Sequence, residues 1–293
     1  MQSQSLKKIF AIAVVIALIV IGFVIYFGKD EAPLPVEEKI EKPFTAKNVI
    51  GKSVNGLDIE NYSFGNGEKH ITFVGGIHGG YEWNTVLLAY KLIDYLKANP
   101  ETVPKNITID VIPAMNPDGV YTATGKEGRF ALTDISDSET ILANGRFNGN
   151  KVDLNRNFDC KWQPESVWRS KKVSSGTEEF SEPESKAFLK YTEENNPVAV
   201  VFWHSQSNAV YTSQCEDGIL AETNKIINAY SKASDYPVAK SFDAYAITGA
   251  VDDWLAKIGI PAFSVELKTH ETIEWEENIL GVKAMLEYFG KED

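Results

Sequence analysis

Short apolar runs alternate with longer amphipathic stretches over most of the chain. The runs have the length of buried strands, whereas the longer stretches repeat their apolar residues at helical spacing. The expected strands lie at residues 70–77, 107–113, 198–203 and 261–265, and the expected helices at 85–98, 219–233 and 274–289. A further strand pair is expected over residues 48–64, around an Asn-Gly turn. Asn116-Pro117-Asp118-Gly119 predicts a tight turn, and residues 121–150 are expected to form one long surface loop. This alternation predicts a single α/β domain with a mixed central sheet flanked by helices.

Residues 1–28 follow a different pattern. Lys7 and Lys8 precede an uncharged apolar run from Ile9 to Phe27. The run is long enough to cross a bilayer and longer than the core of a usual signal peptide. We therefore predict one transmembrane helix that acts as a signal anchor, with a cleaved signal peptide as the alternative. The lysines before the run favour an N-terminus inside and a body on the extracytoplasmic side.

The rest of the chain divides into a stalk and a body. Residues 29–43 contain prolines and alternating charges without periodicity, which indicates a stiff, solvated stalk. Residues 44–293 show neither an internal repeat nor a second composition, so we expect one domain, acting as a monomer. With 43% apolar and 24% charged residues, the composition is globular. The net charge of −12 argues against nucleic acid as a partner.

Several candidate functional side chains stand at the ends of the expected strands. The first run stops at two glycines and is followed by His78, with Glu82 four residues later. Two other runs end at His204 and at Glu266. In α/β sheets the ligand site gathers at the carboxyl ends of the strands, so we expect these four side chains to meet.

His78, Glu82 and His204 have the composition of a catalytic zinc site. Such a site needs about three His, Asp or Glu ligands and one open position. The chain has two further histidines, but His70 opens a strand and His270 lies in a charged run, so neither has a comparable placement. For His204 the alternative is a core histidine satisfied by internal hydrogen bonds.

The stretch from Arg146 to Phe158 carries a more specific set of residues. It places Asn155 and Arg156 after a Val-Asp-Leu sequence, with Arg146 nine positions before Asn155. Other motifs appear in a matching order: the His78…Glu82 loop, Asn116-Pro117-Asp118-Gly119, His204-Ser205, Tyr245 ahead of Gly249, and Ser264-Val265-Glu266-Leu267. In this ordered set the chain resembles the zinc carboxypeptidase family over roughly residues 45–290, the whole body.

The resemblance implies a metal centre and a base. One Zn²⁺ per chain would be held by His78, Glu82 and His204. Asp153 would orient His78 from behind, as carboxylates commonly do for metal-binding histidines. Glu266 would be the general base that activates water and then protonates the leaving amine.

The resemblance also implies how a peptide is held. Arg146 would face the scissile carbonyl and stabilise the developing oxyanion. Asn155, Arg156 and Tyr245 would bind the free C-terminal carboxylate of the substrate, for which a guanidinium offers a matching fork. Such a site selects chain ends and predicts an exopeptidase. The alternative for Arg146, Asn155 and Arg156 is a solvated basic loop.

One departure from the family pattern bears on the metal ligands. Three residues separate His78 from Glu82, whereas many family members have two. Gly79 and Gly80 could let the turn bulge and return Glu82 to the metal. Without such a bulge, Glu82 would not be a ligand.

Asp252 is the candidate for substrate preference. Counted from Tyr245 without gaps, it falls where the family sets the floor of the pocket for the last side chain. An acidic floor would favour the amine of Lys, Arg or diaminopimelate. In the alternative, residues 248–251 begin a helix and Asp252 complements its dipole. Asp253 could equally be the pocket residue.

The two cysteines are expected near the same face. Cys160 follows Arg156 by four residues, and Cys215 follows His204 by eleven. Outside the reducing cytoplasm they would form a disulfide. The alternative is two separate buried thiols.

These observations together predict a membrane-anchored, extracytoplasmic zinc metallocarboxypeptidase that hydrolyses the C-terminal peptide bond of peptides, with a preference for basic residues. One rival hypothesis is a cell-wall peptide amidase or carboxypeptidase that acts next to diaminopimelate. Another is a catalytically inactive, zinc-free binding domain displayed on the stalk.

Overall fold

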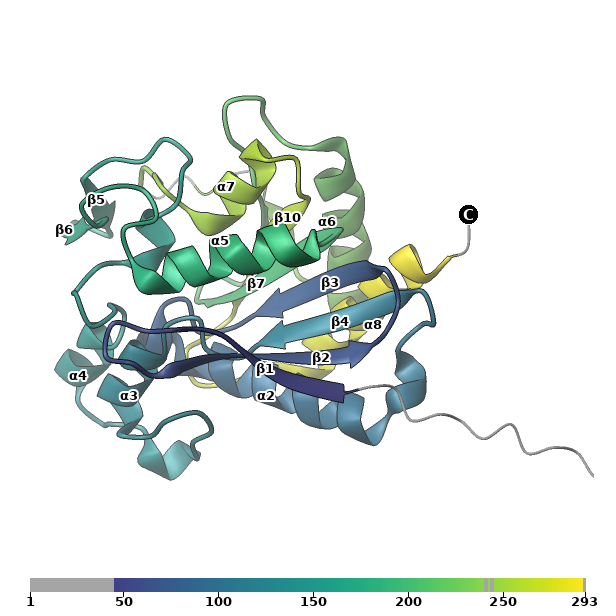
Figure 1. The fold of residues 1–293 in the computed structure, drawn as a ribbon, viewed down its shortest axis with the longest axis horizontal. Coiled ribbons are helices and arrows are strands. Elements are labelled where there is room, and N and C mark those ends of the chain that lie inside the picture. The colour runs from purple at the N-terminus through teal and green to yellow at the C-terminus, as the bar shows by residue number, and fades with distance from the viewer. Residues whose placement is uncertain (1–44, 240–241, 243–244, 292–293) are drawn as a thin grey trace, which may run out of the picture. The chain divides into compact units, whose positions relative to one another are not determined.

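The computed structural model describes residues 45–239, 242 and 245–291 (Figure 1). The predicted transmembrane segment, residues 1–28, and the predicted stalk, residues 29–43, lie outside the described residues. Within the part that is described, no helix is long and apolar enough to cross a membrane.

Eight strands of the described residues form one mixed sheet in the order β1-β2-β4-β3-β7-β10-β8-β9. The strands are β1 (Thr45–Lys52), β2 (Asp58–Gly65), β3 (Lys69–Val74), β4 (Ile107–Ile112), β7 (Ala199–Ser205), β8 (Ala209–Thr212), β9 (Val238–Ala239) and β10 (Ala262–Leu267). The central strands β4, β3, β7 and β10 run parallel, and β2 and β8 flank them in the antiparallel sense. The predicted α/β fold with a mixed sheet is confirmed.

Helices cover both faces of the sheet. They are α2 (Trp83–Ala98), α3 (Pro117–Thr124), α4 (Glu139–Asn144), α5 (Pro183–Asn195), α6 (Ala221–Ser234), α7 (Val251–Lys257) and α8 (Trp275–Gly290). One apolar core lies between the sheet and α2, α6 and α8, and a second lies between the sheet and α5 and α7. In Figure 1, α5 crosses the face of the sheet turned to the viewer.

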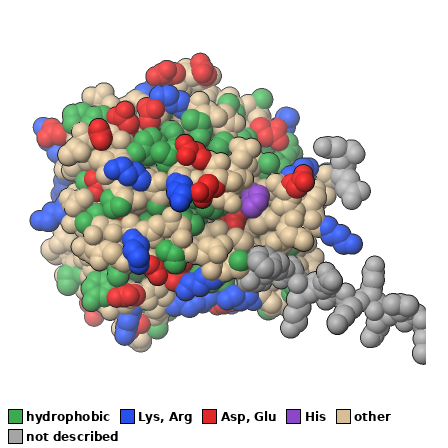
Figure 2. Space-filling view, viewed as in Figure 1, with side chains coloured by type: hydrophobic (Ala, Val, Ile, Leu, Met, Phe, Trp, Pro, Cys, Tyr) green, Lys and Arg blue, Asp and Glu red, His purple; other side chains and the backbone are tan. Residues whose placement is uncertain are grey.

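The two cores explain why the central strands are continuous apolar runs. Every residue of β7 is buried. Because side chains alternate along a strand, Val201 and Trp203 enter the first core, whereas Val200 and Phe202 enter the second. Most charged side chains lie at the surface, where Figure 2 shows both signs interspersed over the visible face.

The region after β4 differs from its prediction. Asn116 to Gly119 was expected to form a tight turn, but it begins helix α3. The Asn116 Oδ1 accepts a hydrogen bond from the Gly119 N–H at 2.9 Å, and Pro117 occupies the first turn. An asparagine cap followed by proline is a helix start. Residues 121–150, expected as one long loop, contain the end of α3, a 3-10 turn (Leu132–Asp134) and α4.

Three further elements were absent from the prediction. They are α5, the strand β8, and a separate two-stranded hairpin of β5 (Glu165–Trp168) and β6 (Lys171–Ser174). The remaining short turns are 3-10 helices at Gly79–Glu82, Pro100–Thr102 and Leu154–Arg156. The first and last of these turns carry functional side chains.

Candidate active site

The parallel strands deliver the predicted side chains to one pocket. His78 follows β3, and Glu82 closes the 3-10 turn from which α2 starts. His204 lies on β7 beside Glu266 on β10, and the two residues are direct partners in the parallel register. All four line a cavity of about 490 Å³. The expectation that strand ends gather these side chains is met.

The extra residue between His78 and Glu82 is taken up by a tight turn. Gly79 has a φ of +48°, and a Cβ there would lie 2.5 Å from the Gly145 carbonyl oxygen. A Cβ on Gly80 would lie 2.2 Å from the Ala123 side chain. Only glycine fits both positions. The turn therefore packs against α3 and α4, and Glu82 points back at His78.

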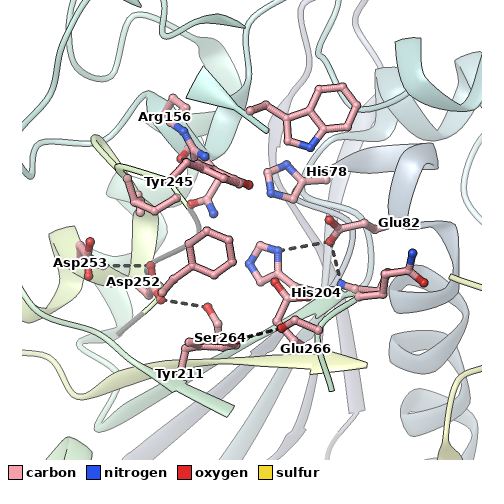
Figure 3. A pocket seen from close by; sticks show the side chains of 18 of the residues that line it. His78, Glu82, Arg156, His204, Tyr211, Tyr245, Asp252, Asp253, Ser264 and Glu266 are labelled. Atoms are coloured by element: carbon pink, nitrogen blue, oxygen red, sulfur yellow. Dashed lines mark hydrogen bonds and ion pairs between the residues drawn. The ribbon is translucent and has the colours of Figure 1, made fainter. Parts of the chain in front are cut away.

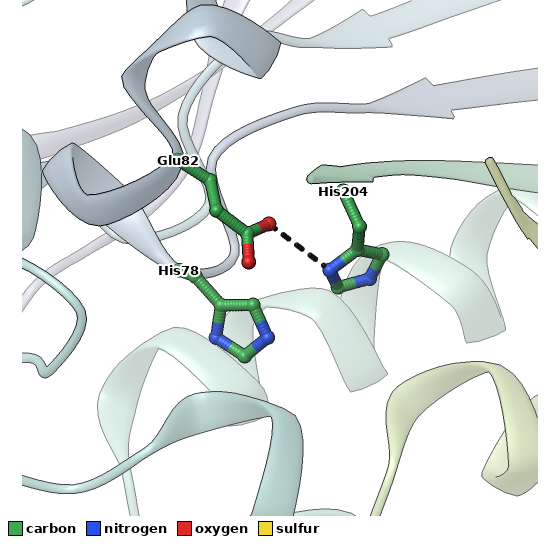
Figure 4. Close-up of side chains that lie close together, drawn as sticks. All are labelled: His78, Glu82 and His204. Carbon is green, nitrogen blue, oxygen red and sulfur yellow. Dashed lines mark ion pairs between the residues drawn. The ribbon is translucent and has the colours of Figure 1, made fainter. Parts of the chain in front are cut away.

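His78, Glu82 and His204 converge (Figure 4). Their ligand atoms lie within 4.8 Å of one another, and all three side chains are buried. The Glu82 Oε2 is 3.2 Å from His204 Nδ1 and accepts a hydrogen bond from the Ser205 N–H, also at 3.2 Å. Three potential ligands from two separate segments thus meet at one point.

The protonation states suit a metal. Burial alone would raise the pKa of Glu82, but the neighbouring imidazoles and Arg146 outweigh it and lower the pKa to about 2. Burial and the charge of Arg146 lower the pKa of His78 to about 4. An ionised carboxylate and a neutral imidazole are the forms that bind metal. For His204, burial lowers the pKa, but the hydrogen bond to Glu82 and its charge outweigh burial and raise it, so a metal ion would displace a proton from this imidazole.

The donor set fits zinc. Two imidazoles and one carboxylate form a common catalytic zinc set. Among the described residues, the buried His78 Nδ1 has no hydrogen-bond partner, although Asp153 Oδ1 lies 3.4 Å away. A buried nitrogen without a partner is costly, and a bound cation would relieve that cost. His78, Glu82 and His204 would hold the ion.

Arg146 and Asp153 form a buried pair behind the ligands. The Asp153 Oδ2 accepts from Arg146 Nε at 3.0 Å and lies 2.9 Å from Nη2. The same guanidinium reaches His78 Nε2 at 3.1 Å and stacks over the Trp168 ring, 4.7 Å from its centroid. Burial would raise the pKa of Asp153, but Arg146 and His78 hold it far below its usual range.

The three residues predicted to bind a terminal carboxylate, Asn155, Arg156 and Tyr245, line the same pocket. Asn155 and Arg156 lie on the 3-10 turn Leu154–Arg156, and Val152, two residues before this turn, makes an isolated bridge with Ser174. Arg156 is buried, and its Nε has no partner among the described residues. Its guanidinium carbon lies 6.0 Å from the Tyr245 ring centroid. The Asn155 Oδ1 accepts from the Val251 N–H at 3.0 Å.

Glu266 has the environment of a proton carrier. Its Oε2 is buried without a hydrogen-bond partner in the described structure. Burial and the negative charge of Glu82 raise the pKa of Glu266 to about 7. A carboxyl group with a pKa near neutrality exchanges protons efficiently at physiological pH.

Asp252 and Asp253 have positions that are compatible with both hypotheses made for them. They lie in the first turn of α7 and also line the pocket. The Asp252 Oδ2 accepts from the Ser264 hydroxyl at 2.9 Å, and the Asp253 Oδ1 accepts from the Gln214 N–H at 2.8 Å. Figure 3 shows both on one side of the pocket, with His78 and Glu82 on the other.

Sequence reasoning set His270 aside, yet its ring lines the pocket. Its Nδ1 is 2.7 Å from the Ser205 hydroxyl, and its ring packs edge-on to Tyr81 with centroids 4.8 Å apart. Trp168 and Arg169, from the unpredicted β5–β6 hairpin, line the same pocket. The one available signal was that His270 stands four positions after Glu266.

Cys160 and Cys215 form a disulfide, with Cα atoms 6.1 Å apart. The alternative of two separate thiols does not hold in this structure. The bond joins the segment after Arg156 to the segment after β8, and both border the pocket.

The fold and the set of candidate ligands agree with a known protein family. Residues 38–283 match the zinc carboxypeptidase family, and the chain belongs to that family. Its members are zinc-dependent, and the predicted family is confirmed.

Relatives within the family differ in their named activities. The chain is 28% identical to gamma-D-glutamyl-L-diamino acid endopeptidase 1 of Lysinibacillus sphaericus, over 77% of this chain and 61% of the relative. It is 32% identical to carboxypeptidase O of Bos taurus, over 57% and 47% respectively. The chain thus spans about half to three fifths of the length of these relatives.

Solved structures with the same fold include murein-tripeptide amidase MpaA from Escherichia coli O157. That match has a TM-score of 0.57 at 20% identity and covers 85% of this chain and 94% of the other. Carboxypeptidase A from Helicoverpa armigera has a TM-score of 0.63 at 20% identity and covers 84% and 70%. At this identity the likeness concerns the fold alone.

Proposed function

We propose that this protein is a zinc-dependent carboxypeptidase that hydrolyses the amide bond before a residue with a free carboxylate. The observation that carries the proposal is the position of Arg156. This buried guanidinium, with an unpartnered Nε, lines the same pocket as the candidate ligands and Glu266. A cation at this depth suits the carboxylate of a chain end.

The proposed reaction gives a role to zinc and to four residues of the pocket. When bound, zinc would supply Lewis acidity, lowering the pKa of water and polarising the carbonyl. Glu266 takes a proton from the attacking water and returns it to the leaving amine. The Arg146 guanidinium donates hydrogen bonds to the developing oxyanion. Arg156 and Tyr245 hold the terminal carboxylate, which places the scissile bond beside Glu266.

The floor favours a residue with an amine on its side chain. Asp252 and Asp253 provide negative charge where the last side chain would end. An ammonium group is the natural partner for two adjacent carboxylates. This supports a preference for lysine-like residues.

A second candidate is hydrolysis of a cell-wall peptide before a diamino acid. The gamma-D-glutamyl-L-diamino acid endopeptidase matches over most of this chain and supports it. The same clamp would hold the carboxylate of the diamino acid, and the same floor its amine.

We place the activity on the extracytoplasmic side of a membrane, anchored by residues 1–28. The apolar run from Ile9 to Phe27 after Lys7 and Lys8 supports this orientation. The Cys160–Cys215 disulfide supports an oxidising compartment. A protease added to intact cells should remove the body from the full-length chain; full protection would contradict the proposal.

The test compares the parent with Glu266→Gln on a C-terminal lysine peptide, its C-terminal amide, and a cell-wall stem peptide. We expect cleavage of peptides with a free carboxylate, and little cleavage of the amide because Arg156 lacks its partner. Glu266→Gln should lower kcat by about 10²–10⁴-fold while zinc content stays unchanged. Glu194→Gln, on the exposed surface of α5, is the matched control.

The outcomes separate the candidates. Faster hydrolysis of the stem peptide than of the lysine peptide would favour the cell-wall function. Equal hydrolysis of the amide and the free peptide would contradict the carboxylate clamp. Full activity of Glu266→Gln would contradict the role of the base.

A further inference from the structure

Three buried carboxylates lie outside the pocket and have no role in the reaction described above. Asp118 belongs to α3, and Glu182 and Glu184 stand at the start of α5. Each is at most 4% exposed, and none lines the cavity. No basic side chain among the described residues forms an ion pair with any of them. Hydrogen-bond donors must therefore satisfy these buried carboxylates.

Most of the donors to α5 come from one turn, residues 148–152. The Asn148 Nδ2 donates to Glu182 Oε2 at 2.8 Å and to Glu184 Oε2 at 3.0 Å. The Asn150 Nδ2 donates to the same Glu182 oxygen, also at 2.8 Å. Because hydrogen bonds to charged groups are stronger than neutral ones, these contacts hold the turn firmly against α5.

The same turn is held against α3 by a backbone group. The Gly149 N–H donates to Asp118 Oδ2 at 3.1 Å, and the Asn55 N–H donates to the same oxygen at 3.2 Å. A Cβ on Gly149 would lie 2.7 Å from that oxygen, so only glycine allows this approach. The turn is therefore fixed between two helices.

Asn148 also gives the turn its shape. Its Oδ1 accepts from the Asn150 N–H at 3.1 Å and from the Val152 N–H at 3.0 Å. Its own N–H donates to the Val152 carbonyl oxygen at 3.1 Å. One side chain thus closes the turn through its oxygen and anchors the turn to α5 through its nitrogen.

The two ends of the turn carry charged residues of the active site. Arg146 stands two residues before the turn, and Asp153 follows it directly. The Arg146 Nε donates to Asp153 Oδ2 at 3.0 Å, so this ion pair spans the base of the turn. A shift of the turn would move one partner relative to the other and change the direction of the guanidinium. Small errors of placement are costly in catalysis.

From these contacts we infer that Asn148 is a positioning residue: anchored on Glu182 and Glu184, it holds the turn that aims Arg146 at the scissile carbonyl. It contacts neither the candidate metal ligands nor the pocket. Burial raises the pKa of Glu184 to about 7, whereas hydrogen bonds from Asn148 and from the Val54 N–H lower it, so these donors favour the ionised anchor. The inference rests on the proposed function, because it assumes that Arg146 acts on the substrate carbonyl.

Two variants of Asn148 test the anchor. Asn148→Asp keeps the oxygen that closes the turn but places a second oxygen against two carboxylates, and Asn148→Ala removes both groups. Each should lower kcat on a C-terminal lysine peptide by roughly tenfold to a hundredfold. KM and zinc content should change little, because the residues that hold the substrate carboxylate and the metal are untouched. A kcat equal to that of the parent in both variants would overturn the inference.

Asn278→Ala is the matched control. Asn278 is also a buried asparagine, but it lies on α8, outside the pocket, where its Oδ1 accepts from the Tyr230 hydroxyl at 2.7 Å. Its replacement should lower the free energy of unfolding and leave kcat per zinc-loaded chain unchanged. An equal loss of kcat in Asn278→Ala and Asn148→Ala would show general destabilisation and overturn the inference.

A double-mutant cycle with Arg146→Ala separates positioning from an independent effect. If Asn148 acts through the guanidinium, Asn148→Ala should lower kcat no further once that guanidinium is absent. The same fold-loss in the parent and in the Arg146→Ala background would contradict the positioning role.

A structural measurement keeps the result independent of catalysis. Crystal structures of the zinc-loaded parent and of Asn148→Ala should show the contact between Arg146 Nε and Asp153 Oδ2 in the parent and its loss in the variant. An unchanged contact in the variant would overturn the inference whether or not any peptide is hydrolysed. Loss of the contact in the variant, together with a parent that cleaves no peptide, would contradict the proposed function alone.

Discussion

Two pairs of carboxylates, lining the pocket or directly behind it, have opposite surroundings. Glu82 and Asp153 face Arg146 and two imidazoles, and their pKa values are lowered despite burial. Glu266 and Asp253 are also shielded from water, but each has another carboxylate among its nearest charges. Their pKa values are raised to about 7.

The difference shows that burial alone does not decide the charge of a carboxyl group. Burial disfavours the ionised form in all four, and the sign of the neighbouring charge decides the outcome. Glu82 and Asp153, which have positive neighbours, stay ionised over the working pH range, as a metal site requires. Glu266 and Asp253, which have negative neighbours, can gain or lose a proton near neutrality, as a general base requires.

Removal of one imidazole should have the largest effect. His204→Ala leaves two of the three ligands, so zinc binding and hydrolysis should both be lost. Zinc content by atomic absorption and peptide hydrolysis measure the two effects. A chelator should abolish the parent's activity, and added zinc should restore it. His70→Ala, which breaks a contact with Asp110, should retain zinc; a full zinc complement in His204→Ala would contradict the ligand set.

Replacement of Arg146 tests the role of the positive charge beside Glu82 and Asp153. Arg146→Lys keeps a positive charge beside Asp153 but loses the fork, so kcat should fall by about 10²–10³-fold with zinc retained. Arg129→Lys, in an exposed pair with Asp94, should leave kcat unchanged. If Arg146→Lys changed KM alone, the guanidinium would bind the ground state and not the oxyanion.

Loss of the disulfide should weaken substrate binding more than zinc binding. Replacement of Cys160 and Cys215 by alanine opens a loop with a sequence separation of 55 residues. The free energy of unfolding should fall by about 4 kcal/mol. Because the bond fixes the segment of Gln214, whose N–H donates to the Asp253 carboxylate, KM should rise severalfold while zinc content and kcat change little. A loss of zinc would show that the two halves of the pocket are not independent.

A pH series should give the smallest effect. The folded pKa of Asp253, about 7, lies above its usual value of 3.8. Its contribution to stability is therefore present below about pH 4 and lost as the pH rises to 7. Relative to Asp253→Asn, the parent should lose unfolding free energy progressively over this range. Urea unfolding at fixed zinc measures it, with the exposed Asp217→Asn as control; a constant difference would contradict the raised pKa.

The sequence was sufficient to predict the side of the pocket that carries the candidate metal ligands and Glu266. His78, His204 and Glu266 stand at the ends of continuous apolar runs, and such runs must be central strands because both of their faces are buried. They meet because parallel strands bring their carboxyl ends to the same edge of the sheet. The capped helix α3 was missed because the Asn-Pro-Asp-Gly sequence suits both a turn and a helix start.

The other side of the pocket was less predictable. The strands β5 and β6 are short and carry several charged residues, so no apolar period marks them. His270 lines the pocket beside Ser205, a residue distant from it in the sequence, with which it makes a contact. Local patterns do not contain such contacts. This is why Asp252, on a recognisable helix start, was found and His270 was not.

The pairing of His204 with Glu266 across β7 and β10 has a consequence for folding accuracy. A slip of β10 by one residue would turn Glu266 to the opposite face of the sheet and bring Val265 into the pocket, because strand side chains alternate. Val265 now packs in the core beneath α2, α6 and α8. A sheet with β10 out of register would therefore lose Glu266 from the pocket and Val265 from the core at the same time. Molecules with that register would be both inactive and less stable.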